Sequence, residues 1–312
     1  MIISLGEALI DFISQKDLDF KGFPGGSPMN TSIAISRLGI PCQFLGRISN
    51  DIFGSRLMYH LNDNSVGTDM VLRTDDSTTL SFVQKQDDGQ ARYGFFANGT
   101  ADRNLPKEEL NKIVLPKEAK ILHFGSISLS MEPCGSTISE FLQNNCKKLM
   151  LSFDPNIRPS LVPDKKIYME RFNQLCRISS VLKLSDEDLL WLYPELSTEK
   201  AIDNLLGFGV SLIALTEGKS GAWLINKKNR ALSPMFDLPV ADTIGAGDTF
   251  HGALLSYLYK KNWIDRELLN NLTKEQLRQI GDYANKAAGI NCSRSGANPP
   301  TKLEIEKELG VK

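Results

Sequence analysis

The sequence predicts an α/β fold with a mostly parallel central sheet and a second, smaller β-sheet, and three observations carry this prediction. Short apolar runs of strand length alternate with longer stretches of helical spacing, a pattern typical of βαβ units. One region breaks this alternation with two β-rich runs on either side of Asp88-Gly89, which predicts a hairpin. The 312 residues, 41% of them hydrophobic, can bury a large core and still supply a small attached unit.

The elements of the large sheet are expected in a regular order. Residues 2–5 form a short apolar run and predict the first strand, and residues 28–38 have helical spacing that ends at Gly39 with Pro41 beyond. Later strands are expected at 42–48, 121–124, 149–153, 181–184 and 212–215, with a helix at 51–61. Ligands of such sheets bind at the carboxyl ends of the strands, so the loops there are the first place to look for a site.

The region that breaks the rhythm predicts a lid. Two short extended segments, 12–14 and 20–23, follow the first strand, and together with the hairpin around Asp88-Gly89 they can pair into a small separate sheet. An ordinary edge meander is the alternative. The expected division is 1–11, 25–71 and 102–312 for an α/β core, and 12–24 and 72–101 for the β-lid.

Charge and composition narrow the class of partner. The chain has 36 Lys and Arg against 37 Asp and Glu, which gives no electrostatic footprint for nucleic acid or an anionic membrane surface. A small-molecule partner is therefore expected. The apolar start lacks a basic segment and carries Glu7 and Asp11, so it predicts neither a signal peptide nor a membrane span, and we expect a cytoplasmic protein.

The segment "ADTIGAGDTFHGALL", residues 241–255, predicts an anion site at a helix start. Apolar residues recur there at i, i+4 and i+8: Phe250, Leu254 and Leu258. Gly245, Ala246 and Gly247 precede or open this helix, where backbone amides without a Cβ beside them can converge on an anion. Asp248 stands in the same turn, where a carboxylate can accept a hydroxyl proton beside a phosphate. The alternative is that Asp248 or Asp242 only caps the helix.

Two other phosphate motifs fail. Residues 216–221, "TEGKSG", contain the end of a Walker A loop, but the first required glycine would fall at Ile213. Residues 245–250 begin like a dinucleotide fingerprint, but Phe250 occupies the position of its last glycine. A dinucleotide site is therefore not expected.

Several segments resemble the PfkB family of ribokinase-like sugar kinases, over nearly the whole chain. "DTIGAGDTFHGALL" (242–255) resembles its C-terminal signature, and "GEALIDFI" (6–13) with "PGGSPMNTSIAISRLGIPCQFLGRISNDIFGSRL" (24–57) resembles its N-terminal one. Three segments resemble bacterial fructokinases in particular: "GTADRNL" (99–105), "FDPNIRPSL" (153–161) and "LKLSDEDLLWL" (182–192). The resemblance implies a ribokinase-like three-layer sandwich with a β-lid over the sugar.

The resemblance also implies roles for single residues around the sugar and the transferred phosphate. The implied sugar-binding residues are Asp11, Gly25, Gly26, Asn30, Arg103 and Asp248. A carboxylate such as Asp11 only accepts hydrogen bonds, which suits sugar hydroxyls, and Arg158 offers a planar, permanent cation to the phosphoryl group. Asp248 is the implied general base, and the amides of Gly245, Ala246 and Gly247 form the implied anion hole.

Nucleotide and metal positions follow from the same resemblance. Those implied for ATP are Thr216, Gly218, Asn285 and Gly247, and those implied for metal ions are Asp188, Asp242, Asn291 and Gly296. Asp188 replaces the acid of an N-x-x-E motif and is a candidate for water-mediated Mg²⁺ binding, although Ser185 and Asp188 also resemble a capping box. Pro300 stands where ribokinases often have a hydroxyl, which leaves K⁺ binding open.

The implied activity is an ATP-dependent sugar kinase, with D-fructose as the expected acceptor. A kinase for 2-keto-3-deoxygluconate, mannose or ribose on the same fold is the first alternative. A catalytically silent binding or assembly module is the second alternative. The intact Asp248 and glycine turn argue against it, because such a module needs neither for chemistry. The apolar side chains of the lid hairpin further predict a homodimer through the lid: Leu80, Phe82, Val83, Tyr93, Phe95 and Phe96.

Overall fold

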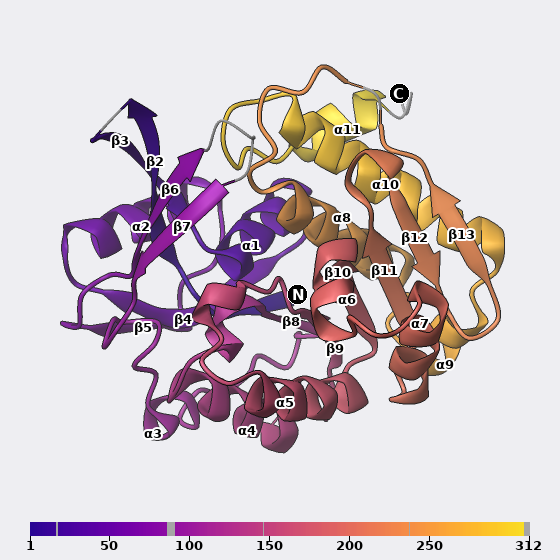
Figure 1. Cartoon of the computed structure of the whole chain (residues 1–312), viewed down its shortest axis with the longest axis horizontal. Helices are drawn as coiled ribbons and strands as arrows, with labels where there is room; N and C mark the ends of the chain where they lie inside the picture. Colours follow the sequence, from indigo (N-terminus) through magenta and orange to yellow (C-terminus); the bar gives the residue numbers. More distant parts are fainter. Residues whose placement is uncertain (17, 86–90, 146, 237, 309–312) are drawn as a thin grey trace.

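The computed structural model describes residues 1–16, 18–85, 91–145, 147–236 and 238–308, and its centre is a nine-stranded sheet of order β13-β12-β11-β10-β9-β8-β1-β4-β5 (Figure 1). The strands are β1 (Ile2–Leu5), β4 (Cys42–Ser49), β5 (Val71–Thr74), β8 (Ile121–Gly125), β9 (Met150–Asp154), β10 (Val181–Ser185), β11 (Leu212–Thr216), β12 (Ala222–Ile225) and β13 (Arg230–Ser233). All neighbours from β5 to β11 pair in parallel, and β12 and β13 are added antiparallel. The mostly parallel sheet is confirmed.

Helices cover both faces of this sheet, because successive strand residues point to opposite sides. On β9, Met150 belongs to one core cluster and Leu151 to the other. The Leu151 side packs against α4 (Cys134–Asn145), α5 (Lys165–Ile178), α6 (Asp186–Leu192) and α7 (Thr198–Gly207). The Met150 side packs against α1 (Ser27–Arg37), α8 (Ala246–Lys261), α9 (Arg266–Asn271), α10 (Lys274–Cys292) and α11 (Lys302–Glu308). The result is a three-layer sandwich.

The remaining helical segments are shorter or peripheral. Helix α2 (Ile52–Asp63) packs beside β4 in a third cluster, α3 (Lys107–Leu110) is one turn, and 3₁₀ turns occupy Ser126–Leu129, Pro159–Leu161 and Gly218–Ser220. The expected helices at 28–38 and 51–61 are thus confirmed as α1 and α2, with ends that differ by two residues or fewer. Among the described residues, none of the helices combines the length and the apolar character that a membrane crossing requires.

A separate four-stranded sheet has the order β3-β2-β6-β7 and stands apart from the large one (Figure 1). Its strands are β2 (Leu9–Lys16), β3 (Asp19–Gly25), β6 (Leu80–Lys85) and β7 (Ala91–Phe96). The β2–β3 pair and the β6–β7 pair join into one sheet because β2 and β6 run side by side in parallel. The predicted small sheet is confirmed and the edge meander is wrong, while the Asp88-Gly89 turn itself lies outside the described residues.

Helices α1 and α8 lie unusually close, and this contact sets the geometry of the site. A Cβ built on Gly252 of α8 would lie 2.7 Å from the Cβ of Ala34 and 3.0 Å from the carbonyl oxygen of Thr31, both on α1. Only glycine fits between the two helices at this separation. The first turns of both helices therefore open into the same space.

Candidate active site

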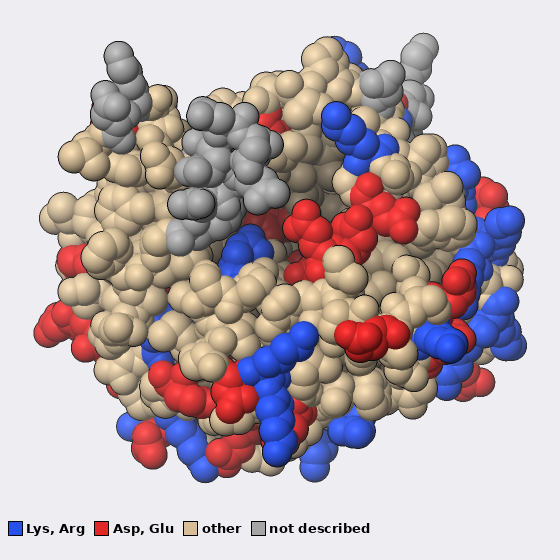
Figure 2. Space-filling model, viewed as in Figure 1, with Lys and Arg blue, Asp and Glu red and all other residues tan. Residues whose placement is uncertain are grey.

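A cavity of about 430 Å³ lies between the small sheet, the carboxyl ends of the parallel strands and the first turns of α1 and α8. Figure 2 shows this face of the molecule hollowed near its middle. Nine of the residues singled out from the sequence line the cavity: Asp11, Gly26, Asn30, Arg158, Asp242, Gly245, Ala246, Gly247 and Asp248. The small sheet supplies one wall through Ser81, Val83 and Phe95.

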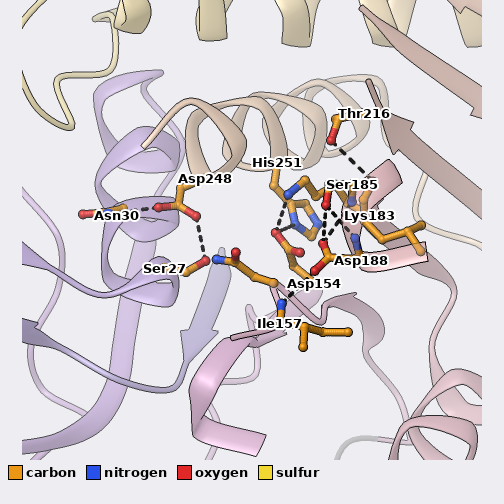
Figure 3. A network of polar contacts seen from close by, with 12 residues as sticks. Ser27, Asn30, Asp154, Ile157, Lys183, Ser185, Asp188, Thr216, Asp248 and His251 are labelled. Atoms are coloured by element: carbon orange, nitrogen blue, oxygen red, sulfur yellow. Dashed lines mark hydrogen bonds and ion pairs between the residues drawn. The ribbon is translucent and has the colours of Figure 1, made fainter. Parts of the chain in front are cut away.

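Asp248 lies in the first turn of α8 and is held by the first turn of α1 (Figure 3). Its Oδ1 accepts a hydrogen bond from Ser27 Oγ at 2.7 Å, and its Oδ2 accepts one from Asn30 Nδ2 at 2.9 Å. Burial raises the pKa of Asp248, and these two hydrogen bonds oppose the rise. The result is an oriented carboxylate with raised basicity, which is the chemistry a general base requires.

The glycine turn before Asp248 has the conformation of an anion cradle. Gly245 is the N-cap of α8, has a φ of +72°, and makes no side-chain cap. The amide of Ala246 donates to the carbonyl oxygen of Thr243 at 3.2 Å, so this amide is engaged within the turn. The amides of Gly247 and Asp248 belong to the first helical turn, which has no intrahelical acceptor for them. The turn and the helix dipole therefore favour an anion at this end of the cavity.

Asp11, on β2, also lines the cavity. Burial raises the pKa of Asp11 to about 6, with a hydrogen bond from Ser81 opposing it. A side chain on Gly25 would collide with the Asp11 carboxylate, so Gly25 leaves room for Asp11 without lining the cavity itself. Gly26 has a φ of +107° and brings its backbone against the carbonyl of Glu7. Asp11 and Asn30 thus face the space beside Asp248.

Arg158 and Arg103 occupy different environments. Arg158 lines the cavity and donates hydrogen bonds to Asn156 Oδ1 at 2.8 Å and to the carbonyl oxygen of Ile157 at 3.1 Å. Arg103 is only 2% exposed, pairs with Asp102 at 3.3 Å and donates to the carbonyl oxygen of Ile127. It is not among the residues that line the cavity, and its geometry is that of a structural ion pair beneath the site.

Of the four residues singled out for nucleotide, Gly247 lines the cavity, whereas Thr216, Gly218 and Asn285 are not among its lining residues. Thr216 Oγ1 is 3.4 Å from the carbonyl oxygen of Leu184, and Gly218 begins a 3₁₀ turn at φ +51°. Asn285 is buried in α10 and donates to the carbonyl oxygens of Ser233 and Pro234. The cavity that holds Asp248 thus includes Gly247 but not Thr216, Gly218 or Asn285.

The residues singled out for metal ions fall into two places. Asp188 closes a capping box with Ser185 and accepts a hydrogen bond from the amide of Ile157 at 2.8 Å (Figure 3). The segment around Asp242 lies beside the segment that holds Asn291 and Gly296: Asp242 accepts from the Gly296 amide at 3.0 Å, and Asn291 Nδ2 donates to the carbonyl oxygen of Ile244 at 2.9 Å. Within the described ranges, no three His, Cys, Asp or Glu side chains gather as a metal cluster.

Sequence reasoning missed a buried polar cluster behind the glycine turn. Lys183 Nζ lies 3.0 Å from Asp154 Oδ2 (Figure 3). His251 Nε2 lies 2.7 Å from Ser152 Oγ. Burial alone would raise the pKa of Asp154, but Lys183 and His251 together outweigh burial and lower that pKa. The available signal was a lysine inside the apolar strand segment 181–184, which a buried ion pair would explain.

A family model described as pfkB family carbohydrate kinase matches residues 1–303. The chain belongs to this family. Family membership makes it an ATP-dependent sugar phosphotransferase, and it agrees with the two converging helix starts, the glycine turn and the oriented Asp248.

Named relatives of this family cover almost the full chain. A fructokinase of Rhizobium leguminosarum bv. trifolii is 36% identical over 286 residues, covering 90% of this chain and 87% of that protein. A probable fructokinase-4 of Arabidopsis thaliana is 35% identical over 322 residues, covering 99% and 96%. The solved structure of a Xylella fastidiosa fructokinase with bound ATP is 26% identical, covers 99% of this chain and 98% of its own, and gives a TM-score of 0.87. The ribokinase-like fold is therefore confirmed.

Proposed function

We propose that this chain is an ATP-dependent fructokinase that transfers the γ-phosphate of ATP to a hydroxyl of D-fructose. The observation that carries the proposal is the carboxylate of Asp248, held by Ser27 and Asn30 at the start of α8 directly after the glycine turn. The names of the relatives support fructose as the acceptor. The bound ATP of the Xylella fastidiosa fructokinase structure supports ATP as the donor.

The proposed reaction has one proton transfer and one phosphoryl transfer. Asp248 accepts the proton of the sugar hydroxyl as the hydroxyl oxygen bonds to the γ-phosphorus and the bond to the leaving ADP oxygen breaks. The amides at the start of α8 stabilise the negative charge on the transferred group, and Arg158 supplies a permanent cation. Asp11 and Asn30 orient the sugar through its hydroxyls. Residues 12–24 and 72–101, which include most of the small sheet, form the proposed lid, and this lid excludes water from the space.

Magnesium is the proposed divalent ion, and its own ligands are expected to be phosphate oxygens and water. Mg²⁺ commonly binds through one or two carboxylates plus substrate phosphates, and it neutralises charge on the phosphates. Asp188 fits only a water-mediated role, because its carboxylate already accepts hydrogen bonds from Ile157 and Ser185. The proposed K⁺ site lies where Asp242 meets the segment of Asn291 and Gly296. A comparison of turnover with and without potassium tests this site.

We further propose a homodimer through the small sheet, with a second copy of this chain as the partner. Val83 and Phe95 face the cavity, so the opposite face of the sheet carries the aromatic cluster of Phe12, Phe20, Phe82 and Phe96. Phe96 is 67% exposed there. The side chain of Tyr93 lies outside the described residues. A second aromatic face of the same kind would cover this patch.

The test of the proposed activity is ADP release with a panel of sugars. Fructose, mannose, ribose and 2-keto-3-deoxygluconate are each supplied with magnesium and ATP, and fructose is expected to give the highest kcat/KM. Far better turnover of the ketodeoxy acid would move the assignment to a kinase for that sugar. A lack of sugar-dependent ADP release from every member would leave a silent binding module as the answer.

A further inference from the structure

Lys183 lies directly behind the glycine turn that cradles the anion. It belongs to β10, is 4% exposed, and is one of the residues that line the cavity. A Cβ built on Gly247 would lie 3.0 Å from Lys183 Nζ and 3.8 Å from its Cε. Gly247 is helical and has no positive φ, so close approach of the ammonium is the reason that a side chain is disfavoured here.

The ammonium of Lys183 is fixed from the side away from the cavity. Asp154 Oδ2 accepts its hydrogen bond at 3.0 Å and lies 3.5 Å from His251 Nδ1, while the His251 ring is anchored to Ser152. Within the described part of the chain, Asp154 is the acceptor that this ammonium finds, although an ammonium carries three N–H donors. Burial disfavours its charge, but the carboxylates of Asp154, Asp188 and Asp248 together outweigh burial, and the pKa of Lys183 is raised. The group is therefore a cation at neutral pH.

We propose that Lys183 is a catalytic residue whose ammonium contacts the transferring phosphoryl group through the gap left by Gly247. This role rests on the phosphoryl transfer proposed above but not on fructose as the acceptor. The backbone amides of the α8 start and the Lys183 ammonium then bind the same anion from two sides. Asp154 and His251 are positioning residues that hold the ammonium in place.

The competing explanation is a structural ion pair that only stabilises the fold. A comparison of Lys183→Met with the double variant Asp154→Asn/Lys183→Met distinguishes this explanation from a catalytic role. The single variant leaves the Asp154 carboxylate buried without its cation and should lose stability, whereas the double variant removes both charges and should regain most of it. If Lys183 is catalytic, both variants lose kcat by about 10²–10³-fold, the range for one oxyanion donor.

The binding of two nucleotide probes gives a readout that does not depend on the sugar. The ratio of the Kd values of AMPPNP and ADP, measured by calorimetry with magnesium, isolates the contribution of the terminal phosphate. We expect this ratio to rise at least tenfold in the double variant and to change in Lys183→Arg, because the planar guanidinium is larger than the ammonium and presents its donors in a different geometry. Wild-type kcat in the double variant, or an AMPPNP to ADP ratio equal to that of wild type, would overturn the proposal. Failure of fructose as substrate leaves this nucleotide test unaffected.

Discussion

The contact of α1 with α8 at Gly252 sets the distance between these helices, and Asp248 of α8 is held by residues of α1. Gly252→Ala places a methyl group 2.7 Å from Ala34 Cβ and 3.0 Å from the Thr31 carbonyl oxygen. An ordinary contact of about 4 Å requires the helices to separate by about 1 Å. Overpacking of this kind costs about 1–3 kcal/mol, or roughly 2–10 °C in Tm for a chain of this size.

The same displacement acts on the proposed base. The hydrogen bonds that hold Asp248 cross from α8 to Ser27 and Asn30 of α1 at 2.7 Å and 2.9 Å. A separation of about 1 Å would take both beyond hydrogen-bonding distance, and a misplacement of that size commonly costs about 10²-fold in rate. We therefore expect Gly252→Ala to lower both Tm and kcat, with KM for ATP less affected.

Gly207→Ala is the matched control. Gly207 ends α7, and a Cβ built there meets no atom within 4 Å. Alanine at such a helical position should leave kcat unchanged and raise stability by up to about 1 kcal/mol. The assays are thermal melting and coupled ADP release. Wild-type values of both Tm and kcat in Gly252→Ala would refute the reasoning that the helix contact sets the site.

Three further predictions follow from burial and charge. The sugar KM should rise as pH falls through about 6, where Asp11 becomes protonated. The raised pKa of Asp11 means that its charged form is unfavourable in the fold, so Asp11→Asn should gain Tm relative to wild type as pH rises from about 4 to about 7. A Tm difference that does not depend on pH would contradict this. Arg103→Leu should lose about 3–5 kcal/mol of stability because it leaves Asp102 without its ion-pair partner, and the sugar KM of the folded protein should stay unchanged. An unchanged Tm with a large rise in KM would instead show that Arg103 binds the sugar. Phe96→Glu should give a monomer in light scattering at micromolar protein, while the control Val114→Glu, at an exposed apolar residue outside the small sheet, should not; a wild-type mass for both would remove the proposed interface.

The order of the strands and helices was predictable because each is a local pattern. Strand residues on both faces of the large sheet are buried, which produces short continuous apolar runs such as 121–124 and 212–215, and these runs end within one residue of β8 and β11. The start of α8 was equally visible, because Gly245 combines an N-cap position with a positive φ that few other residues adopt.

The partners of single charged residues were not predictable, because they come from segments far apart in the chain. Nothing beside Lys183 in the sequence indicates that Asp154 and the backbone of Gly247 surround its ammonium. Arg103 looks like an accessible cation in the sequence, and only the packing around Asp102 and Ile127 shows that it is buried. Asp188 illustrates the opposite case, since the short spacing from Ser185 correctly indicated a capping box.

The most direct test of the central claim is the turnover of Asp248→Asn with saturating sugar, magnesium and ATP. Asparagine keeps the size of the side chain and an acceptor for Ser27 or a first-turn amide, but it has no useful basicity near neutral pH. We predict that kcat falls by about 10²–10⁴-fold while Tm and the Kd of ATP change little, and that the surface control Asp203→Asn, 68% exposed, retains wild-type kcat. Near-wild-type kcat in Asp248→Asn would contradict the role of Asp248 as general base and leave it as a residue that only links α8 to Ser27 and Asn30 of α1.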